Sequence, residues 1–148
     1  MKKYTLKDLK PVSKPTDLIK KQPEKYLSNI DYPGNEIASG ILNDALTLGA
    51  NEVQIKRVNE WIIISADIAW FRSNLDGSQD ISHVFDRFIA IPEKCVNSFR
   101  TEILVFTFSK ACFVNENGKV TSIKGNYPSV DILNAINGTL PFVIGFKC

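Results

Sequence analysis

The side chains that could carry chemistry in this chain are few and widely spaced. The sequence has one histidine, His83, and three cysteines, Cys95, Cys112 and Cys148. A structural zinc site uses Cys and His ligands at close spacing, and a cysteine nucleophile needs a basic partner beside it. No two cysteines form a C-x-x-C pair. We therefore expect reduced thiols, no metal site and no catalytic residue.

Carboxylates offer a second kind of site. Asp76, Asp80 and Asp86 follow one another along a polar stretch, and carboxylate oxygens are ligands that Mg²⁺ accepts. The stretch lacks the pattern of a calcium-binding loop, and Asp76-Gly77 is typical of a turn. We interpret these carboxylates as surface groups of a loop and of the helix that follows it.

Two polar sets are our candidates for recognition of a partner. One follows an apolar strand at the point where the chain leaves the sheet, and the other follows Pro92 at the start of an apolar element. Trp and Arg are enriched at binding hot spots. We predict these partner-binding residues: Asp67, Trp70 and Arg72, beside Phe71, in the first set, and Asn97, Arg100 and Glu102 in the second. The alternative is that Trp70 caps the core and that Arg100 forms a surface ion pair.

The stretch Asn43–Ile55 resembles the helix-to-strand segment of the GHKL ATPases, the class of mismatch-repair and gyrase-type enzymes. In that family a Glu activates water and an Asn binds magnesium, just before an Asp-Ala-Gly-Ala stretch. The matching positions here hold Asn43, Asp44 and Thr47, none of which is the residue that this chemistry needs. The resemblance therefore implies no nucleotide function, and we expect no cofactor.

The best-patterned segment, Asn35–Phe71, predicts a helix followed by two strands. Apolar residues recur at helical spacing from Asn35 to Leu48, with Asn35 as a plausible N-cap and Gly49 as the left-handed residue that closes the helix. The strand Glu52–Arg57 alternates, so that one face is expected to meet water. The strand Glu60–Asp67 is apolar on both faces and belongs in the centre of a sheet.

The second half of the chain contains a strong turn and one ambiguous region. Asn117-Gly118 is a hairpin signal, because a type I′ turn needs positive φ at both positions. Ser98–Val114 suits a helix or a strand, and we favour a helix starting near Asn97 that leads into a strand. The predicted elements are a helix at Gln79–Phe88, strands at Ala111–Asn115 and Lys119–Lys124, a helix at Val130–Ile136 capped by Ser129 and closed by Asn137-Gly138, and a strand at Phe142–Lys147.

The N-terminal segment differs in composition from the rest. Residues 1–34 hold four of the seven prolines, and residues 1–26 carry eight Lys against three acidic residues, a net charge of +5 on a body of −3. We predict an extended Pro/Lys-rich arm over residues 1–34, which Leu9, Leu18, Ile19, Tyr26 and Leu27 could anchor. Residues 35–148 then form a single α+β domain, an antiparallel or mixed sheet of about five strands with three to four helices on one face.

These features favour a binding protein over an enzyme. No apolar run approaches the roughly 20 residues of a membrane helix, so we expect no membrane partner and a cytoplasmic location. The Lys residues are not interleaved with aromatics, so a nucleic-acid partner is not expected. Our hypothesis is a non-catalytic domain that binds a protein, specifically a bacterial immunity protein that occludes the active site of a toxin. A small enzyme with a dispersed carboxylate or Cys site (Asp67, Glu102 or Cys112) and a homo-oligomeric structural module are the alternatives.

Overall fold

The structure is a computed structural model and describes residues 3, 5, 14–73, 75, 80–95 and 98–148. Within them the chain forms one antiparallel sheet of five strands, in the order β1-β2-β5-β3-β4. The strands are β1 (Val53–Val58), β2 (Trp61–Ala66), β3 (Ala111–Glu116), β4 (Lys119–Lys124) and β5 (Phe142–Lys147). The predicted α+β class and the strand count are confirmed.

Two hairpins are joined through β5. β1 pairs with β2 and β3 pairs with β4, and β5 lies between β2 and β3 with antiparallel pairing on both sides. The turn at Asn117 and Gly118 has φ values of 52° and 92°, which confirms the predicted hairpin. Asn59, in the turn between β1 and β2, also has positive φ, at 55°.

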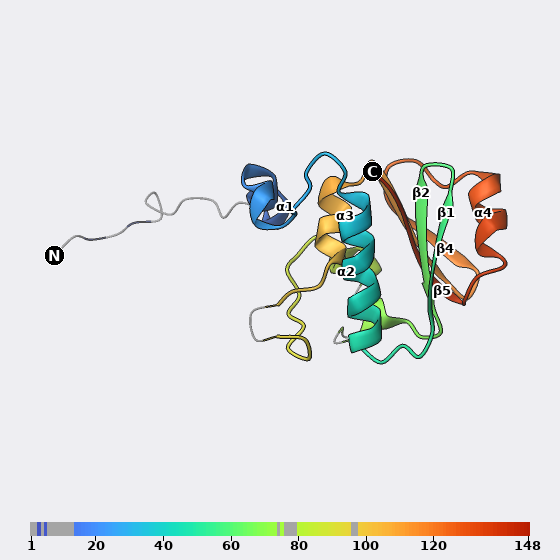
Figure 1. Cartoon of the computed structure of the whole chain (residues 1–148). Helices are drawn as coiled ribbons and strands as arrows, with labels where there is room; N and C mark the ends of the chain where they lie inside the picture. The colour runs from blue at the N-terminus through green and yellow to red at the C-terminus, as the bar shows by residue number, and fades with distance from the viewer. Residues whose placement is uncertain (1–2, 4, 6–13, 74, 76–79, 96–97) are drawn as a thin grey trace.

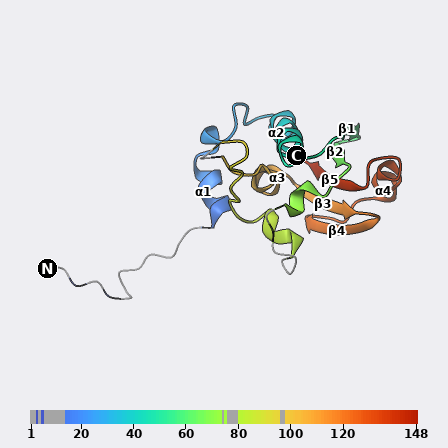
Figure 2. The ribbon, with the colours of Figure 1, turned by 90° about the horizontal axis from the view of Figure 1, so that it is seen from below.

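Helices cover both faces of the sheet. α1 (Pro15–Lys21), α2 (Gly34–Thr47) and α3 (Glu102–Phe108) lie on one face, and α4 (Val130–Ile136) lies alone on the other (Figure 1). The same division is visible from below (Figure 2). The prediction that the helices share one face is wrong, because β2, β3 and β5 are apolar on both faces and each face needs a cover.

The larger core lies under α1–α3. Alternate strand residues point into it, including Ile62 and Ile64 of β2, while Ile63 points to the opposite face. The smaller core under α4 consists of five buried residues: Ile63, Phe113, Ile132, Ile136 and Val143. Gly145 of β5 also faces α4, and the Phe113 ring fills the space above it, 2.3 Å from the position of an added Cβ.

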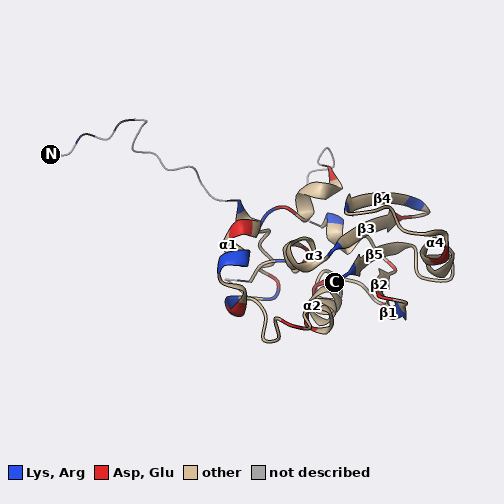
Figure 3. Ribbon diagram, turned by 90° about the horizontal axis from the view of Figure 1, so that it is seen from above, with Lys and Arg blue, Asp and Glu red and all other residues tan. Residues whose placement is uncertain are grey.

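The N-terminal segment contributes to the larger core from residue 15 onward. Ile19 of α1 and Leu27 are buried in it, as the anchor prediction expected, whereas Leu18 is exposed. Tyr26 packs against the rings of Phe88 and Phe99, with centroid distances of 6.3 and 5.9 Å. The outer face of α1 carries both charge signs, from Asp17, Lys20 and Lys21 (Figure 3). Leu9 lies outside the described residues, and the boundary at residue 34 stays a prediction.

Several local predictions need correction. The residue before α2 is Pro33 and Asn35 lies inside the helix, although Gly49 does close it with φ of +109°. The predicted helix at Gln79–Phe88 is wrong. The described chain there forms a 3₁₀ turn, η4 (Ile81–Val84), which the Asp80 side chain caps. The described part of the ambiguous region is indeed a helix followed by a strand, with the helix beginning at Glu102 rather than near Asn97.

Further details differ from the sequence patterns. Ile55, an apolar residue of the alternating strand β1, is 45% exposed, and β1 is an edge strand of the sheet. Ser129 occupies the N-cap position of α4 without a side-chain hydrogen bond, and Asn137 has φ of −62°, so the helix does not end in a left-handed residue.

Candidate functional site

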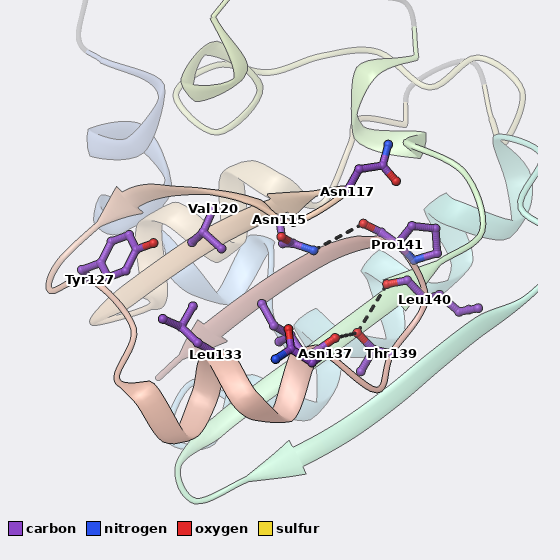
Figure 4. Close-up of a pocket in the computed structure, with 11 residues that line it drawn as sticks. Asn115, Asn117, Val120, Tyr127, Leu133, Asn137, Thr139, Leu140 and Pro141 are labelled. Carbon is purple, nitrogen blue, oxygen red and sulfur yellow. Dashed lines mark hydrogen bonds between the residues drawn. The ribbon is translucent and has the colours of Figure 1, made fainter.

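A pocket of about 520 Å³ opens beside the C-terminal end of α4 (Figure 4). In Figure 4, Tyr127, Val120 and Leu133 lie on one side of it, and Thr139, Leu140 and Pro141 lie on the other. We call it the asparagine pocket, after the three amide side chains in its wall: Asn115 of β3, Asn117 of the hairpin turn and Asn137 after α4.

Short hydrogen bonds fix the loop that closes the asparagine pocket. The backbone N–H of Asn117 donates to the carbonyl of Pro141 over 3.0 Å, and this bond joins the hairpin turn to the start of β5. The Thr139 hydroxyl donates to the carbonyl of Ile136 over 2.6 Å. Because both ends of residues 137–141 are held in this way, the pocket is formed before any ligand arrives.

The chemistry of the asparagine pocket is polar and uncharged. Among the described residues that line it there is no Asp, Glu, His, Lys, Arg or Cys. Asn115 is 6% exposed; its Nδ2 donates to the Pro141 carbonyl over 3.4 Å, and its Oδ1 has no hydrogen-bond partner among the described residues. Such a pocket can accept and donate hydrogen bonds, and its amides cannot serve as a general acid or base near neutral pH.

A second concave region, of about 600 Å³, lies on the other side of the sheet near the start of α2. We call it the Tyr32 groove. Ile62 and Phe108 are apolar residues of its wall, and Tyr32 and Ile30, which also line it, are 78% and 48% exposed. Four charged residues also line it: Asp31, Arg57, Glu60 and Lys110.

Three of the six predicted partner-binding residues are inside the protein. Trp70, Arg100 and Glu102 have exposed fractions of 0%, 1% and 0%. Side chains this buried offer no area to a partner in this conformation. These residues were predicted to bind a partner from their types and from their places beside apolar segments. Neither feature of the sequence shows that the fold buries them. Phe71 beside them is also buried, and Asn97 lies outside the described residues.

The structure brings Arg100 and Glu102 together as a buried ion pair. Arg100 Nη2 lies 2.7 Å from Glu102 Oε1 and also donates to the Trp70 carbonyl, while Nη1 donates to the Ser73 carbonyl over 2.8 Å. The pair ties the start of α3 to the segment that follows β2. Burial raises the pKa of Glu102, and the charge of Arg100 opposes that rise.

A second buried carboxylate completes this cluster. Asp44 of α2 accepts the backbone N–H of Thr101 over 2.8 Å and lies 3.5 Å from Lys94 Nζ. Gly40 makes this possible, because a Cβ there would meet the Thr101 side chain at 2.7 Å. We call Asp44, Arg100, Thr101 and Glu102 the buried polar junction. It joins α2, the start of α3 and the segment that follows β2.

The other two predicted residues are half-exposed and hold loops. Asp67 accepts the backbone N–H groups of Asn51 and Glu52, over 3.1 and 3.3 Å, and so fixes the entry to β1. Arg72 forms a two-bond ion pair with Glu116 of β3, with Nη2 and Oε2 2.9 Å apart. This hydrogen bonding raises the pKa of Arg72 and lowers that of Glu116.

The thiols and carboxylates show no built reaction centre in the described part of the chain. Burial raises the pKa of Cys112 to about 12 and also raises that of Cys148, so both stay protonated near neutral pH and are poor nucleophiles. His83, half-exposed, contacts Asp86 and Arg87. No group of three or more His, Cys, Asp or Glu among the described residues is placed to hold a metal ion.

Sequence reasoning missed the residues of both concave regions. Asn117 and Asn137 were assigned to turns, Asn115 to a strand, and Tyr127 to no element at all. The pocket needs residues 115–120 and residues 133–141 to lie side by side in the fold. No local sequence pattern predicts that contact. An exposed Tyr beside a Pro, as in Tyr127-Pro128 and Tyr32-Pro33, was the one visible signal.

Comparison with known proteins gives no match to a protein family, to a curated protein or to a solved structure. Among the described helices, none has the length and apolar character to cross a membrane.

Proposed function

We propose that this chain is a non-catalytic protein-binding domain and that the Tyr32 groove is its contact surface. The observation that carries the proposal is the exposure of Tyr32 and Ile30 beside an apolar wall with charged residues around it. Protein interfaces combine an apolar, aromatic centre with a polar rim, and Tyr and Arg are enriched among the residues that dominate binding.

Tyr32 is presented by a well-fixed segment. Its backbone N–H donates to Asn29 Oδ1 over 3.2 Å, and Pro33 follows it directly. The backbone N–H of Ser28 donates to both carboxylate oxygens of Glu36 in α2, over 3.0 and 2.8 Å. A fixed aromatic anchor loses little conformational entropy on binding, which favours affinity.

The finer form of the proposal is a bacterial immunity protein whose partner is a toxin. Residues 27–148 carry a net charge of −3, and an acidic surface speeds association with a basic partner such as a nuclease. In this form the groove surface covers the active site of the toxin, and the protein acts in the cytoplasm.

The test is complex formation with the product of the gene adjacent to the one that encodes this chain. Size-exclusion chromatography and calorimetry should give a complex with a dissociation constant between nanomolar and micromolar. Tyr32→Ala should weaken it by at least about 30-fold, the effect of a hot-spot residue worth 2 kcal/mol. The matched control is Tyr127→Ala, an exposed tyrosine beside the other concave region, which should leave the affinity unchanged.

Equal effects of the two tyrosine variants would contradict the groove as the contact surface. The absence of any complex at micromolar concentration would remove the immunity proposal.

A further inference from the structure

We infer that the asparagine pocket is a second binding site, separate from the Tyr32 groove, and that its ligand is an uncharged pyranose sugar. Its volume of about 520 Å³ falls within the range of about 300–1,000 Å³ that is usual for small-molecule sites. The inference does not depend on the proposed protein partner, because the two regions are lined by different residues.

The hydrogen-bonding groups of the pocket match sugar hydroxyls. Each asparagine amide both donates and accepts, and a hydroxyl does the same, so the two pair in several orientations. The side chains of Asn117, Asn137 and Tyr127 are in the wall with Asn115 (Figure 4). A ring that carries several hydroxyls can therefore satisfy several of these groups at once.

The absence of charged side chains among the described lining residues selects against ionic ligands. A phosphate, carboxylate or ammonium group would lose hydration on entry and find no counter-charge in the wall, which is unfavourable. An uncharged ligand loses far less. The pocket should therefore prefer a neutral sugar to its phosphorylated or amino derivative.

The apolar part of the wall suits the C–H face of a sugar ring. Tyr127 is 58% exposed at the rim, and Val120 and Leu133 lie on the same side of the pocket (Figure 4). An aromatic ring contributes a flat apolar area together with a hydroxyl at its tip. This combination of a flat apolar patch and amides in one wall fits a pyranose better than a small apolar ligand.

Asn115 gives an energetic reason for binding. A buried acceptor without a partner destabilises the folded chain, and Asn115 Oδ1 is such an acceptor. Among the described residues, its amide makes one hydrogen bond, the 3.4 Å bond from Nδ2 to the Pro141 carbonyl, which is long for a hydrogen bond. A modest rotation of the amide toward the pocket would let Oδ1 accept a ligand hydroxyl, so binding would satisfy a group that folding leaves unpaired.

The experiment is a titration of the full chain, ¹⁵N-labelled, with three neutral probes: the methyl pyranosides of glucose, galactose and mannose. Glucose 6-phosphate and glucosamine are the charged comparisons, and uridine tests for a neutral nucleoside. We expect at least one methyl pyranoside to bind with a millimolar dissociation constant, with shifts at the side-chain amides of Asn115 and Asn137. The charged comparisons should bind at least about tenfold more weakly.

Single-residue variants test whether the sugar binds in the asparagine pocket. Tyr127→Ala and Asn137→Ala should each weaken binding by about fivefold or more. The control is Asn134→Ala, which removes an exposed amide of α4 that is outside the pocket wall and should leave sugar binding unchanged. Because both pocket positions are exposed at the surface, these variants should fold.

Three results would overturn the inference: no shift with any methyl pyranoside at about 50 mM, where a millimolar site is nearly saturated; charged and neutral sugars binding equally; or uridine binding while the pyranosides do not.

Discussion

The two faces of the sheet bury different kinds of polar group. Under α1–α3 the buried polar side chains include three charged ones, Arg100, Glu102 and Asp44, which have partners at 2.7 to 3.5 Å. Arg100 Nε and Glu102 Oε2 make no hydrogen bond among the described residues. Under α4 they are uncharged, and Ser65 Oγ and Asn115 Oδ1 have no partner among the described residues. Ser65 and Asn115 both pair with Val143 of β5 and so lie in one row on this face.

The difference follows from how much cover each face has. Three helices exclude water from one face, and a charge there must be paired because its desolvation is expensive. A single seven-residue helix covers the other face, and a pocket remains open at its end. An ion pair links elements on the first face, whereas on the second the buried Asn115 lies in the wall of the asparagine pocket.

The largest loss of stability on the α1–α3 face is expected for Arg100→Ala. It leaves Glu102 buried without its partner and removes the Arg100 donor from the Ser73 carbonyl, so the free energy of unfolding should fall by about 3–5 kcal/mol. Urea denaturation measures it. The control is Arg87→Ala, an exposed residue paired with Asp86, which should change stability by less than about 1 kcal/mol.

A double variant makes the argument stricter. Arg100→Met with Glu102→Leu removes both charges and should recover most of the lost stability. A double variant as unstable as Arg100→Ala would mean that packing, and not the uncompensated charge, causes the loss.

On the α4 face the corresponding destabilising variant is Gly145→Ala. The added methyl group meets the Phe113 ring, and overpacking of this kind lowers the free energy of unfolding by about 1–3 kcal/mol. Gly138→Ala is the matched control, since no atom lies within 4 Å of its Cβ position. Equal stability of the two variants in thermal unfolding would show that the ring moves aside without loss.

The pH dependence of stability should distinguish two carboxyl groups. The pKa of Glu102 is raised in the folded chain. The contribution of the Glu102 carboxyl to the free energy of unfolding is therefore fully present below the ordinary carboxyl pKa, and it is lost as the pH rises through the raised value. Glu116 behaves oppositely: its pKa is lowered by Arg72, so its contribution is present above the ordinary pKa and is lost as the pH falls through the lowered one.

Urea unfolding across pH 3–8 checks both signs. As the pH rises, the free energy of unfolding of Glu102→Gln should increase relative to that of the original chain. That of Glu116→Gln should decrease relative to it. Parallel curves for the two variants would refute the assignment.

The smallest expected effects on stability belong to the asparagine pocket. Tyr127→Ala and Asn137→Ala should each alter the free energy of unfolding by no more than about 0.5 kcal/mol, as is usual for exposed positions. A loss above 1 kcal/mol would give these residues a structural role and weaken the contrast between the faces.

Local chemistry was sufficient to predict most of the fold. Gly49 and Asn117-Gly118 predicted positive φ, and the solid apolar block of β2 predicted an inner strand; all three hold in the structure. The helix at Gln79–Phe88 failed because Ile81, Val84 and Phe85 have helical spacing in sequence, while the described chain makes only a 3₁₀ turn there.

The candidate sites were beyond reach of the sequence for a physical reason. Arg100 and Glu102 are charged, so the sequence favoured a surface position, whereas in the fold both are buried beside Asp44 of α2 and the Trp70–Ser73 segment. Asn115 and Asn137 become neighbours through the crossing to β5, a contact that no spacing along the chain encodes.

The central place of β5 matters while the protein is being made. Among the described strands it alone pairs with both hairpins, and it is formed by residues 142–147. Both hairpins precede β5 in the chain, so during synthesis each keeps an unpaired inner edge until residues 142–147 emerge from the ribosome. Such edges invite pairing with other chains, so a nascent copy is most vulnerable to aggregation before β5 is released.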